Sequence, residues 1–325
     1  MIMSRTPLRV TFVGGGTDLP QYFIKHGPGA VVSATVNKYI HIMVNRKFDN
    51  SFRISYSTTE IVDKVDKIKH PSVREALKLL DIRGGIEVVS ISDVHSRGTG
   101  LGSSSTFLVG LLNALHAYLG EHVSPARLAS EAVKIEREIL EEPGGLQDQY
   151  IAAFGGLRVM KFMPNGSVSV DPVIVKDEFL NELQASMMLL YTGVERNSGS
   201  IHVSQSKDIN QKINSYDQMK GLVDDLLYAF QKGDIEDIGK IMDRNWNLKR
   251  ELTNGITDGS IDDLYRRAID CGAFGGKLIG AGGGGFLMFI ASPEVQSRIE
   301  REFRGLRRVD FKFDFRGSRI EFVGD

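Results

Sequence analysis

The feature that most constrains this chain is a loop rich in glycine and serine, set between a strand-like run and a helix-like run. Residues 86–94 carry valine and isoleucine at strand-like positions, and residues 107–119 form an apolar helical run closed by Gly120. Between them, residues 97–106 read RGTGLGSSST. A strand, a glycine-rich loop and a helix start bring several backbone N–H groups to one point, where the helix macrodipole adds partial positive charge. The pattern therefore predicts a phosphate-binding loop.

Two commoner phosphate loops are excluded. A Walker A loop needs a lysine before its serine or threonine, and no lysine lies between Lys78 and Lys134. A Rossmann loop needs a third glycine where Ser103 stands. A glycine-rich turn capped by serines is the plain alternative, but three glycines and three consecutive hydroxyls exceed what capping requires.

Composition limits the class of protein. With 325 residues the chain is long enough for two domains, and 42% hydrophobic with 25% charged residues is typical of globular proteins. A net charge of −1 gives no field that favours nucleic acid or an anionic membrane, so neither is expected as a partner. The single cysteine, Cys271, excludes an internal disulfide. There is no 18-residue apolar run, so we expect a cytoplasmic protein; its oligomeric state is left open.

The order of elements predicts an α+β protein with two domains. The first domain, residues 1–180, is expected to be mostly β, with strands at 8–13, 30–45, 52–56, 86–94, 157–162 and 168–175, and helices at 71–80, 107–119 and 125–139. The second, residues 181–325, is expected to contain strands at 187–192, 277–279, 285–290 and 309–315, helical segments at 200–251, 261–269 and 293–303, and residues 319–323 extending its sheet. This second series follows the ferredoxin-like order with inserted helices.

Glycine-rich loops occur three times, at residues 14–16, 98–102 and 280–285. They come from distant parts of the chain and from both expected domains. Because glycine lets backbone approach another group closely, three such loops predict a shared cleft that holds a ligand.

Three stretches carry a resemblance to a known family. They are residues 5–18 (RTPLRVTFVGGGTD), 98–105 (GTGLGSSS) and 277–285 (KLIGAGGGG). In this order and spacing the sequence resembles the GHMP kinases, named for galactokinase, homoserine kinase, mevalonate kinase and phosphomevalonate kinase. The resemblance implies the two-domain GHMP kinase fold, with a ribosomal S5 domain 2-like N-terminal domain that carries the ATP phosphate loop and a ferredoxin-like C-terminal domain.

Within this family, the N-terminal motif and residues 142–150 (EPGGLQDQY) are most similar to the kinases of D-glycero-D-manno-heptose phosphate. The similarity implies ATP-dependent phosphorylation of the anomeric (C1) hydroxyl of D-glycero-D-manno-heptose 7-phosphate, giving the 1,7-bisphosphate for GDP-heptose synthesis. L-Fucose kinase domains share part of the pattern, so an L-fucose or other sugar 1-kinase is the alternative. A sugar sensor of the same fold without catalysis is the alternative from another class.

The resemblance also implies roles for individual residues in binding ATP and Mg²⁺. The phosphate loop would bind ATP through Gly98, Thr99, Gly100, Leu101, Gly102, Ser103, Ser104 and Ser105. Ser104 and Glu136 would hold Mg²⁺, for which oxygen ligands are suitable. Helical spacing places Glu136 at the edge of the buried stripe of its helix, where a solvated glutamate is the ordinary alternative.

For the acceptor, the resemblance implies Asp148 as general base, or as the group that orients the acceptor hydroxyl, and Arg9 as the cation beside it. Their plain alternatives are an exposed aspartate at a helix start and a strand-edge surface arginine. Asp18 would bind sugar hydroxyls, although an aspartate after glycines also serves as a turn residue. The remaining expected acceptor-binding residues are Gly15, Gly16, Thr17, Gly282, Gly283 and, for a distal phosphate, Arg196. Lys249 is expected on a solvated face.

Overall fold

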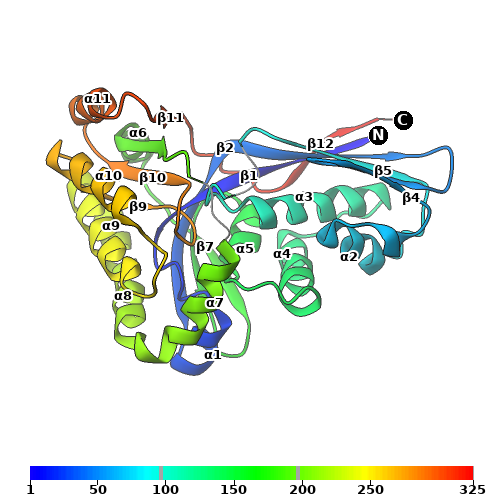
Figure 1. Cartoon of the computed structure of the whole chain (residues 1–325), viewed down its shortest axis with the longest axis horizontal. Coiled ribbons are helices and arrows are strands. Elements are labelled where there is room, and N and C mark those ends of the chain that lie inside the picture. Colours follow the sequence, from blue (N-terminus) through cyan, green and yellow to red (C-terminus); the bar gives the residue numbers. More distant parts are fainter. Residues whose placement is uncertain (95–97, 195–197, 325) are drawn as a thin grey trace.

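The computed structural model describes residues 1–94, 98–194 and 198–324. Two sheets form its framework, and helices pack against both (Figure 1). The strands are β1 (Ile2–Val13), β2 (Gly29–Arg46), β3 (Phe52–Ser55), β4 (Thr59–Val62), β5 (Ile86–Ser92), β6 (Leu157–Phe162), β7 (Val168–Pro172), β8 (Met187–Tyr191), β9 (Gly275–Leu278), β10 (Phe286–Ile290), β11 (Arg307–Arg308) and β12 (Arg319–Val323).

The helices are distributed over both halves of the chain. They are α1 (Pro20–His26), η1 (Val65–Lys67), α2 (Pro71–Leu79), α3 (Ser103–Tyr118), α4 (Pro125–Val133), η2 (Lys134–Ile139), α5 (Gln147–Phe154), α6 (Asp177–Ser186), α7 (Ser198–Asp208), η3 (Ile209–Gln211), α8 (Ile213–Lys232), α9 (Ile235–Arg250), α10 (Gly259–Asp270) and α11 (Pro293–Glu302). Among the described residues, no helix is long and apolar enough to span a membrane.

The larger sheet has the order β12-β1-β2-β5-β3-β4, with β6 on β2 and β7 on β6. Its centre is the long antiparallel pair of β1 and β2, in which Ile2 lies opposite Val44 and Val13 opposite Val32. Strand β2 is rich in valine, isoleucine and threonine, which favour a pleated, buried strand. Helices α2 to α5 lie on one side of this sheet (Figure 1).

The smaller sheet has the antiparallel order β11-β8-β10-β9, which confirms the predicted ferredoxin-like topology. Helices α7 to α10 lie between β8 and β9 in the chain, and α11 lies between β10 and β11. Strands β8 and β10 are almost wholly buried, because their successive side chains alternate between two hydrophobic clusters.

The end of the chain differs from the prediction. Residues 309–315 were expected to form a strand, but the short strand β11 ends before this range, at Arg308, and within the range Phe313 forms an isolated bridge to Val36. β12 pairs with β1, so it extends the larger sheet rather than the smaller one. The reason lies in β2, which pairs with β6 up to Ala34 and with β5 from Ile40 onward. Residues 312–314 fill the gap between these pairings with hydrogen bonds to Asn37 and Thr35.

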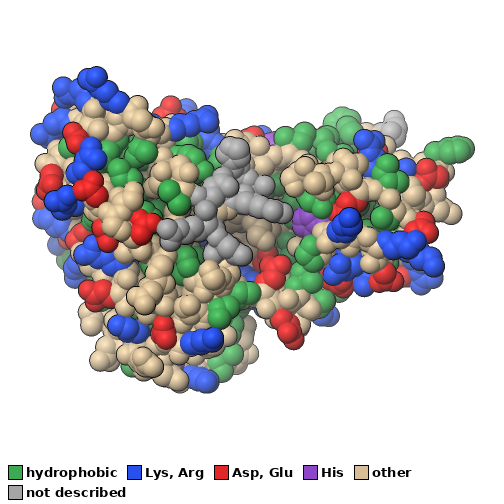
Figure 2. Space-filling model, viewed as in Figure 1, with side chains coloured by type: hydrophobic (Ala, Val, Ile, Leu, Met, Phe, Trp, Pro, Cys, Tyr) green, Lys and Arg blue, Asp and Glu red, His purple; other side chains and the backbone are tan. Residues whose placement is uncertain are grey.

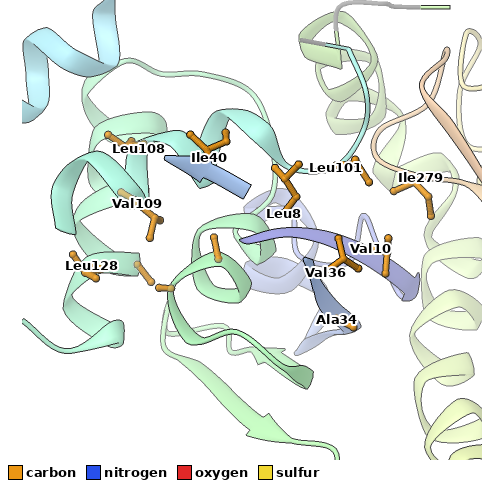
Figure 3. Close-up of a cluster of buried hydrophobic side chains, with 14 of the residues drawn as sticks. Leu8, Val10, Ala34, Val36, Ile40, Leu101, Leu108, Val109, Leu128 and Ile279 are labelled. Carbon is orange, nitrogen blue, oxygen red and sulfur yellow. The ribbon is translucent and has the colours of Figure 1, made fainter. Parts of the chain in front are cut away.

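The core of the larger sheet extends to the 98–102 and 280–285 loops. Leu101 of the 98–102 loop and Ile279, next to the 280–285 loop, are fully buried in the same cluster as Leu8 and Val10 (Figure 3). Each buried aliphatic side chain of this size contributes about 1.5–3 kcal/mol. Both glycine-rich loops are therefore anchored to the core by apolar residues at their bases.

Candidate active site

Helix α3 begins at Ser103, four residues earlier than the sequence predicts, so the three serines form its first turn. Before it, Gly98, Gly100 and Gly102 have φ angles of 68°, 78° and 77°. Glycine adopts this left-handed conformation without the cost that a side chain would add. Among the residues that the structure describes, no side chain caps the helix start. Its first N–H groups are therefore available to an anion, as the pattern predicts.

Glycines bring the 98–102 and 280–285 loops into direct backbone contact. A Cβ atom on Gly100 would lie 2.2 Å from the carbonyl oxygen of Ile279, and one on Gly280 would lie 2.5 Å from the Cα of Gly100. A Cβ on Gly285 would lie 2.4 Å from the carbonyl oxygen of Thr99. The sequence predicts that these loops approach a ligand closely. The structure shows that their backbones also contact each other.

The two residues predicted to hold a metal ion lie together. Ser104 Oγ donates to Glu136 Oε1 at 3.2 Å, and Ser105 Oγ donates to Oε2 at 2.8 Å. Gln149 also donates to this carboxylate through Nε2, while its buried Oε1 has no partner among the described residues. A carboxylate, hydroxyls and an orphaned amide oxygen form an oxygen-rich donor set, which fits Mg²⁺.

Glu136 is more deeply buried than the helical spacing predicts. It is 1% exposed, although a regular helix would place it at the edge of the buried stripe. The helix does not stay regular: after Val133 it continues as the π-helical segment η2. A π turn rotates the following side chains relative to an α-helix, and such turns are frequent at functional sites. Here it carries Glu136 inward to the start of α3.

Arg9 and Asp148, predicted as the catalytic pair, form a bidentate ion pair. Nε of Arg9 donates to Oδ1 of Asp148 at 2.7 Å, and Nη2 donates to Oδ2 at 2.8 Å. Arg9 Nη1 also donates to the carbonyl oxygen of Gly100 in the phosphate loop. The arginine side chain is buried, whereas that of Asp148 is 23% exposed at the first turn of α5. The carboxylate is thus held in a fixed orientation and open to a ligand.

Asp18 is held by backbone. Its Oδ1 accepts from the N–H of Gly16 at 2.8 Å and its Oδ2 from the N–H of Gln147 at 3.2 Å. A Cβ on Gly145 would lie 1.9 Å from Oδ2, so the chain before α5 comes this close only because residue 145 is glycine. Asp18 consequently links the N-terminal glycine loop to the segment that carries Asp148.

A pocket joins these groups, and we call it the acceptor pocket after the role that the resemblance implies for its residues. Its walls come from both halves of the chain. It is lined by Arg9, Thr11, Gly15, Gly16, Asp18, Leu19, Arg137, Gly145, Gln147, Asp148, His202, Gln205, Lys249, Lys277, Gly280 and Ala281.

Some predicted acceptor residues lie elsewhere. The Thr17 hydroxyl bonds to the carbonyl oxygens of Gly14 and Ala30, so it shapes the turn. The third loop reaches the pocket through its first two residues, whereas Gly282 packs against Ile256 and Gly283 donates its N–H to the carbonyl oxygen of that residue. Arg196 lies outside the described residues.

Part of the wall from the C-terminal half, formed by Lys249, His202 and Gln205, was missed by sequence reasoning. Lys249 was expected on a solvated face, but it is 5% exposed, because it lies in register with the buried Met242 and Asn245 on α9. The signal in the sequence is that Lys249 occupies a position where the helical period of α9 places a buried residue. His202 and Gln205 had no such signal, because their helix α7 has no amphipathic pattern.

Burial shifts the pKa values of the basic groups on this wall. Desolvation, with the nearby Arg9, lowers the pKa of Lys249 to about 8. Desolvation also lowers the pKa of Lys277 well below its usual range, and Lys249 and Arg9 add to the effect. Burial lowers the pKa of the His202 imidazole. Burial therefore disfavours the charged forms of these basic groups while the pocket holds no anion.

A second cavity, of about 620 Å³, adjoins the phosphate loop at Thr99. Tyr56 and residues of β5 form one side, and Tyr191 and Phe286 of the smaller sheet form another. This cavity is more apolar than the acceptor pocket and large enough for a nucleoside. The phosphate loop therefore has a small polar pocket on one side and a larger cavity on the other.

Comparisons with known proteins agree with this arrangement. Residues 67–156 match the model of the GHMP kinases N terminal domain, and residues 226–306 match that of the GHMP kinases C terminal domain. D-glycero-alpha-D-manno-heptose 7-phosphate kinase of Campylobacter jejuni is 31% identical over 98% of both chains. L-fucokinase/L-fucose-1-P guanylyltransferase of Bacteroides fragilis is 24% identical over 93% of this chain and 36% of its own.

A solved structure shares the whole fold. The D-glycero-D-manno-heptose 1-phosphate kinase from Bacteroides thetaiotaomicron superposes with a TM-score of 0.84 over 100% of both chains, at 24% identity. With the phosphate loop and acceptor pocket described above, these matches define an enzyme that phosphorylates a sugar. The chain belongs to the GHMP kinase family.

Proposed function

We propose that this sugar kinase transfers the γ-phosphoryl group of ATP to the anomeric hydroxyl of D-glycero-D-manno-heptose 7-phosphate, to make the 1,7-bisphosphate used for GDP-heptose synthesis. The observation that carries the proposal is the Arg9–Asp148 pair, which stands between the phosphate loop and the acceptor pocket. The named substrate of the 31% identical relative supports the choice of sugar. The basic side chains that line the pocket would favour a phosphorylated acceptor over a neutral one, because an anion stabilises their charged forms.

In the proposed transfer, the protein forms no covalent bond to phosphorus and accepts one proton. The acceptor oxygen forms a bond to the γ-phosphorus, and the bond from that phosphorus to the bridging oxygen breaks, its electron pair leaving with ADP. The hydroxyl proton passes to the carboxylate of Asp148. Arg9 orients this carboxylate and offsets the negative charge that develops during transfer.

On the donor side, the backbone from Gly98 to Ser105 would bind the phosphates, and the cavity beside Thr99 would take the nucleoside. Ser104 and Glu136 would hold Mg²⁺, which neutralises phosphate charge when bound. Residues 1–180 would then form the nucleotide-binding domain and residues 181–325 the second domain, with β12 returning to the first sheet.

The acceptor is tested with a panel in which ADP release is measured. Heptose 7-phosphate is expected to give the highest kcat/KM, above heptose, heptose 1-phosphate, L-fucose and galactose. The panel includes heptose 1-phosphate because a structural relative is named for it. L-Fucose as the best acceptor would support the alternative, and the position of the new phosphate is read by ³¹P NMR. A product phosphorylated anywhere but C1 would contradict the proposal.

The metal assignment is tested with Glu136→Gln. The amide keeps the size of the side chain but removes its charge, so the affinity for ATP with Mg²⁺ is expected to fall at least about tenfold, while metal-free ATP binds nearly as before. Calorimetric titration with and without Mg²⁺ separates the two. Glu138→Gln, an exposed change in the same segment, is the control and should change neither affinity. An equal loss in both titrations would show that Glu136 only supports the loop.

A further inference from the structure

Lys249 has donors that the protein does not use. It lies in the last turn of α9, is 5% exposed and lines the acceptor pocket. An ammonium has three N–H donors. Among the described residues, the one hydrogen bond of this ammonium goes to the carbonyl oxygen of Gly280. Two donors are therefore left for a ligand in the pocket.

The contacts of Lys249 place it at the junction of the two glycine-rich loops. Its partner Gly280 packs against Gly100, and the carbonyl oxygen of Gly100 accepts from Arg9 Nη1. Lys249 and Arg9 therefore reach the same junction from the two halves of the chain. A phosphoryl group that passes from the phosphate loop to an acceptor beside Asp148 would pass close to this junction, because Arg9 contacts both Gly100 and Asp148.

The charges that face Lys249 come from several elements. Arg9 and Asp18 belong to β1 and the turn that follows it, Asp148 to α5, His202 to α7 and Lys277 to β9. With Arg137, whose Nη2 lies 3.6 Å from Oε2 of Glu136, four arginine or lysine side chains and two carboxylates line the pocket. A buried cation without a counter-charge is costly unless a ligand supplies one. The arrangement thus suits an anion that arrives during the reaction.

We propose that Lys249 is a second cation of the transfer site and donates hydrogen bonds to the phosphoryl group as it passes from ATP to the acceptor oxygen. The assignment rests on the kinase activity and adds a residue to it. Lys249 forms and breaks no covalent bond: the oxygen–phosphorus bonds change as described above, and the hydroxyl proton goes to Asp148. The ammonium offsets the charge on the equatorial oxygens.

A consequence is a specific dependence on pH. Because burial lowers the pKa of Lys249 to about 8, the ammonium loses its proton above this pH in the free enzyme. The value of kcat/KM, which reports on the free enzyme, is expected to decline above about pH 8. The decline in kcat should lie at higher pH, because bound phosphates favour the charged form.

The experiment compares Lys249→Met and Lys249→Arg with the wild type across pH 6–10, using whichever panel sugar is accepted. Lys249→Met is expected to lower kcat about 10²-fold or more at the pH values where the wild-type ammonium is protonated, and the difference should shrink as the wild type declines at high pH. Lys249→Arg should retain more activity and should lose the decline near pH 8, because a guanidinium stays protonated throughout. Lys240→Met removes an exposed lysine from the same helix and should behave like wild type.

Several results would overturn the proposal. Near-normal kcat in Lys249→Met would do so, as would an unchanged decline near pH 8 in Lys249→Arg. A loss confined to KM for the phosphorylated sugar, and absent for its unphosphorylated form, would assign Lys249 to the phosphate that the acceptor carries. Should the methionine variant fail to fold, the arginine variant still decides. Failure of the proposed acceptor appears instead in the wild type, as a different preferred sugar.

Discussion

Asp148→Asn is expected to lower kcat about 10²–10⁴-fold, the range that a general base contributes. Asparagine keeps the size of the side chain and one oxygen for Arg9, but it cannot take the proton of the acceptor hydroxyl. ATP binding should be nearly unchanged, because the carboxylate lies on the acceptor side of the phosphate loop. Steady-state kinetics and calorimetric ATP titration measure the two effects.

The matched control for this change is Asp177→Asn. Asp148 and Asp177 both lie in the first turn of a helix, where a negative charge interacts favourably with the macrodipole, but Asp177 is exposed and away from the pocket. The control should lose a few tenths of a kcal/mol in stability and no activity. If Asp148→Asn turned over within a few-fold of wild type, another group would have to accept the proton.

Gly100→Ala is expected to lower kcat/KM about 10²-fold, the loss that a displacement of about 1 Å can cause at a reacting centre. The new Cβ would lie 2.2 Å from the carbonyl oxygen of Ile279, and backbone on both sides prevents a local escape. The two glycine-rich loops must therefore separate, which moves Arg9 and Lys249 away from their carbonyl partners. Kinetics and thermal unfolding are measured together.

Gly120→Ala provides a control with the same backbone strain. Gly120 has a φ of 79°, against 78° for Gly100, but a Cβ there meets nothing within 4 Å. A left-handed alanine destabilises both variants by roughly 1–2 kcal/mol, and only Gly100→Ala also introduces a collision with backbone. Equal activity in the two variants would mean that contact between the loops does not matter for transfer.

The phosphate loop is a feature that the local sequence is sufficient to predict. Three glycines followed by three serines between a strand and a helix predict an anion site, because backbone N–H groups and the helix start are local features. The start of α3 was placed four residues late, since serines were assigned to the loop rather than to the first helical turn. The chemistry of the loop did not depend on this boundary.

Glu136 and Lys249 show where local reasoning fails. A regular helical period puts Glu136 at an edge, but the π turn in η2 buries it. Lys249 adjoins Arg250 and looks like part of a solvated face, although it falls in register with the buried side of α9. Glu136 departs from the period of 3.6 residues because its segment is not a regular α-helix, whereas Lys249 follows that period and was misassigned because lysine is usually exposed.

The end of the chain shows a feature of the fold that the order of elements did not predict. The order of elements alone indicated a ferredoxin-like second half, and the smaller sheet has that order. The partner of β12 was not predictable from the order, because a strand pairs with whichever edge is free. β1 offers that edge, and the gap along β2 takes residues 312–314.

By itself, the sequence determined the family, the class of fold, the phosphate loop and the residue types of the site, because these depend on motifs and on periodic patterns of neighbouring residues. Only the tertiary structure determined which of these residues come together in the site. It joined Arg9 to Asp148 across 139 positions, set the two glycine-rich loops backbone to backbone, and brought Lys249 to their junction. Such contacts arise from packing between distant segments, and no local pattern of residues specifies which distant groups will meet.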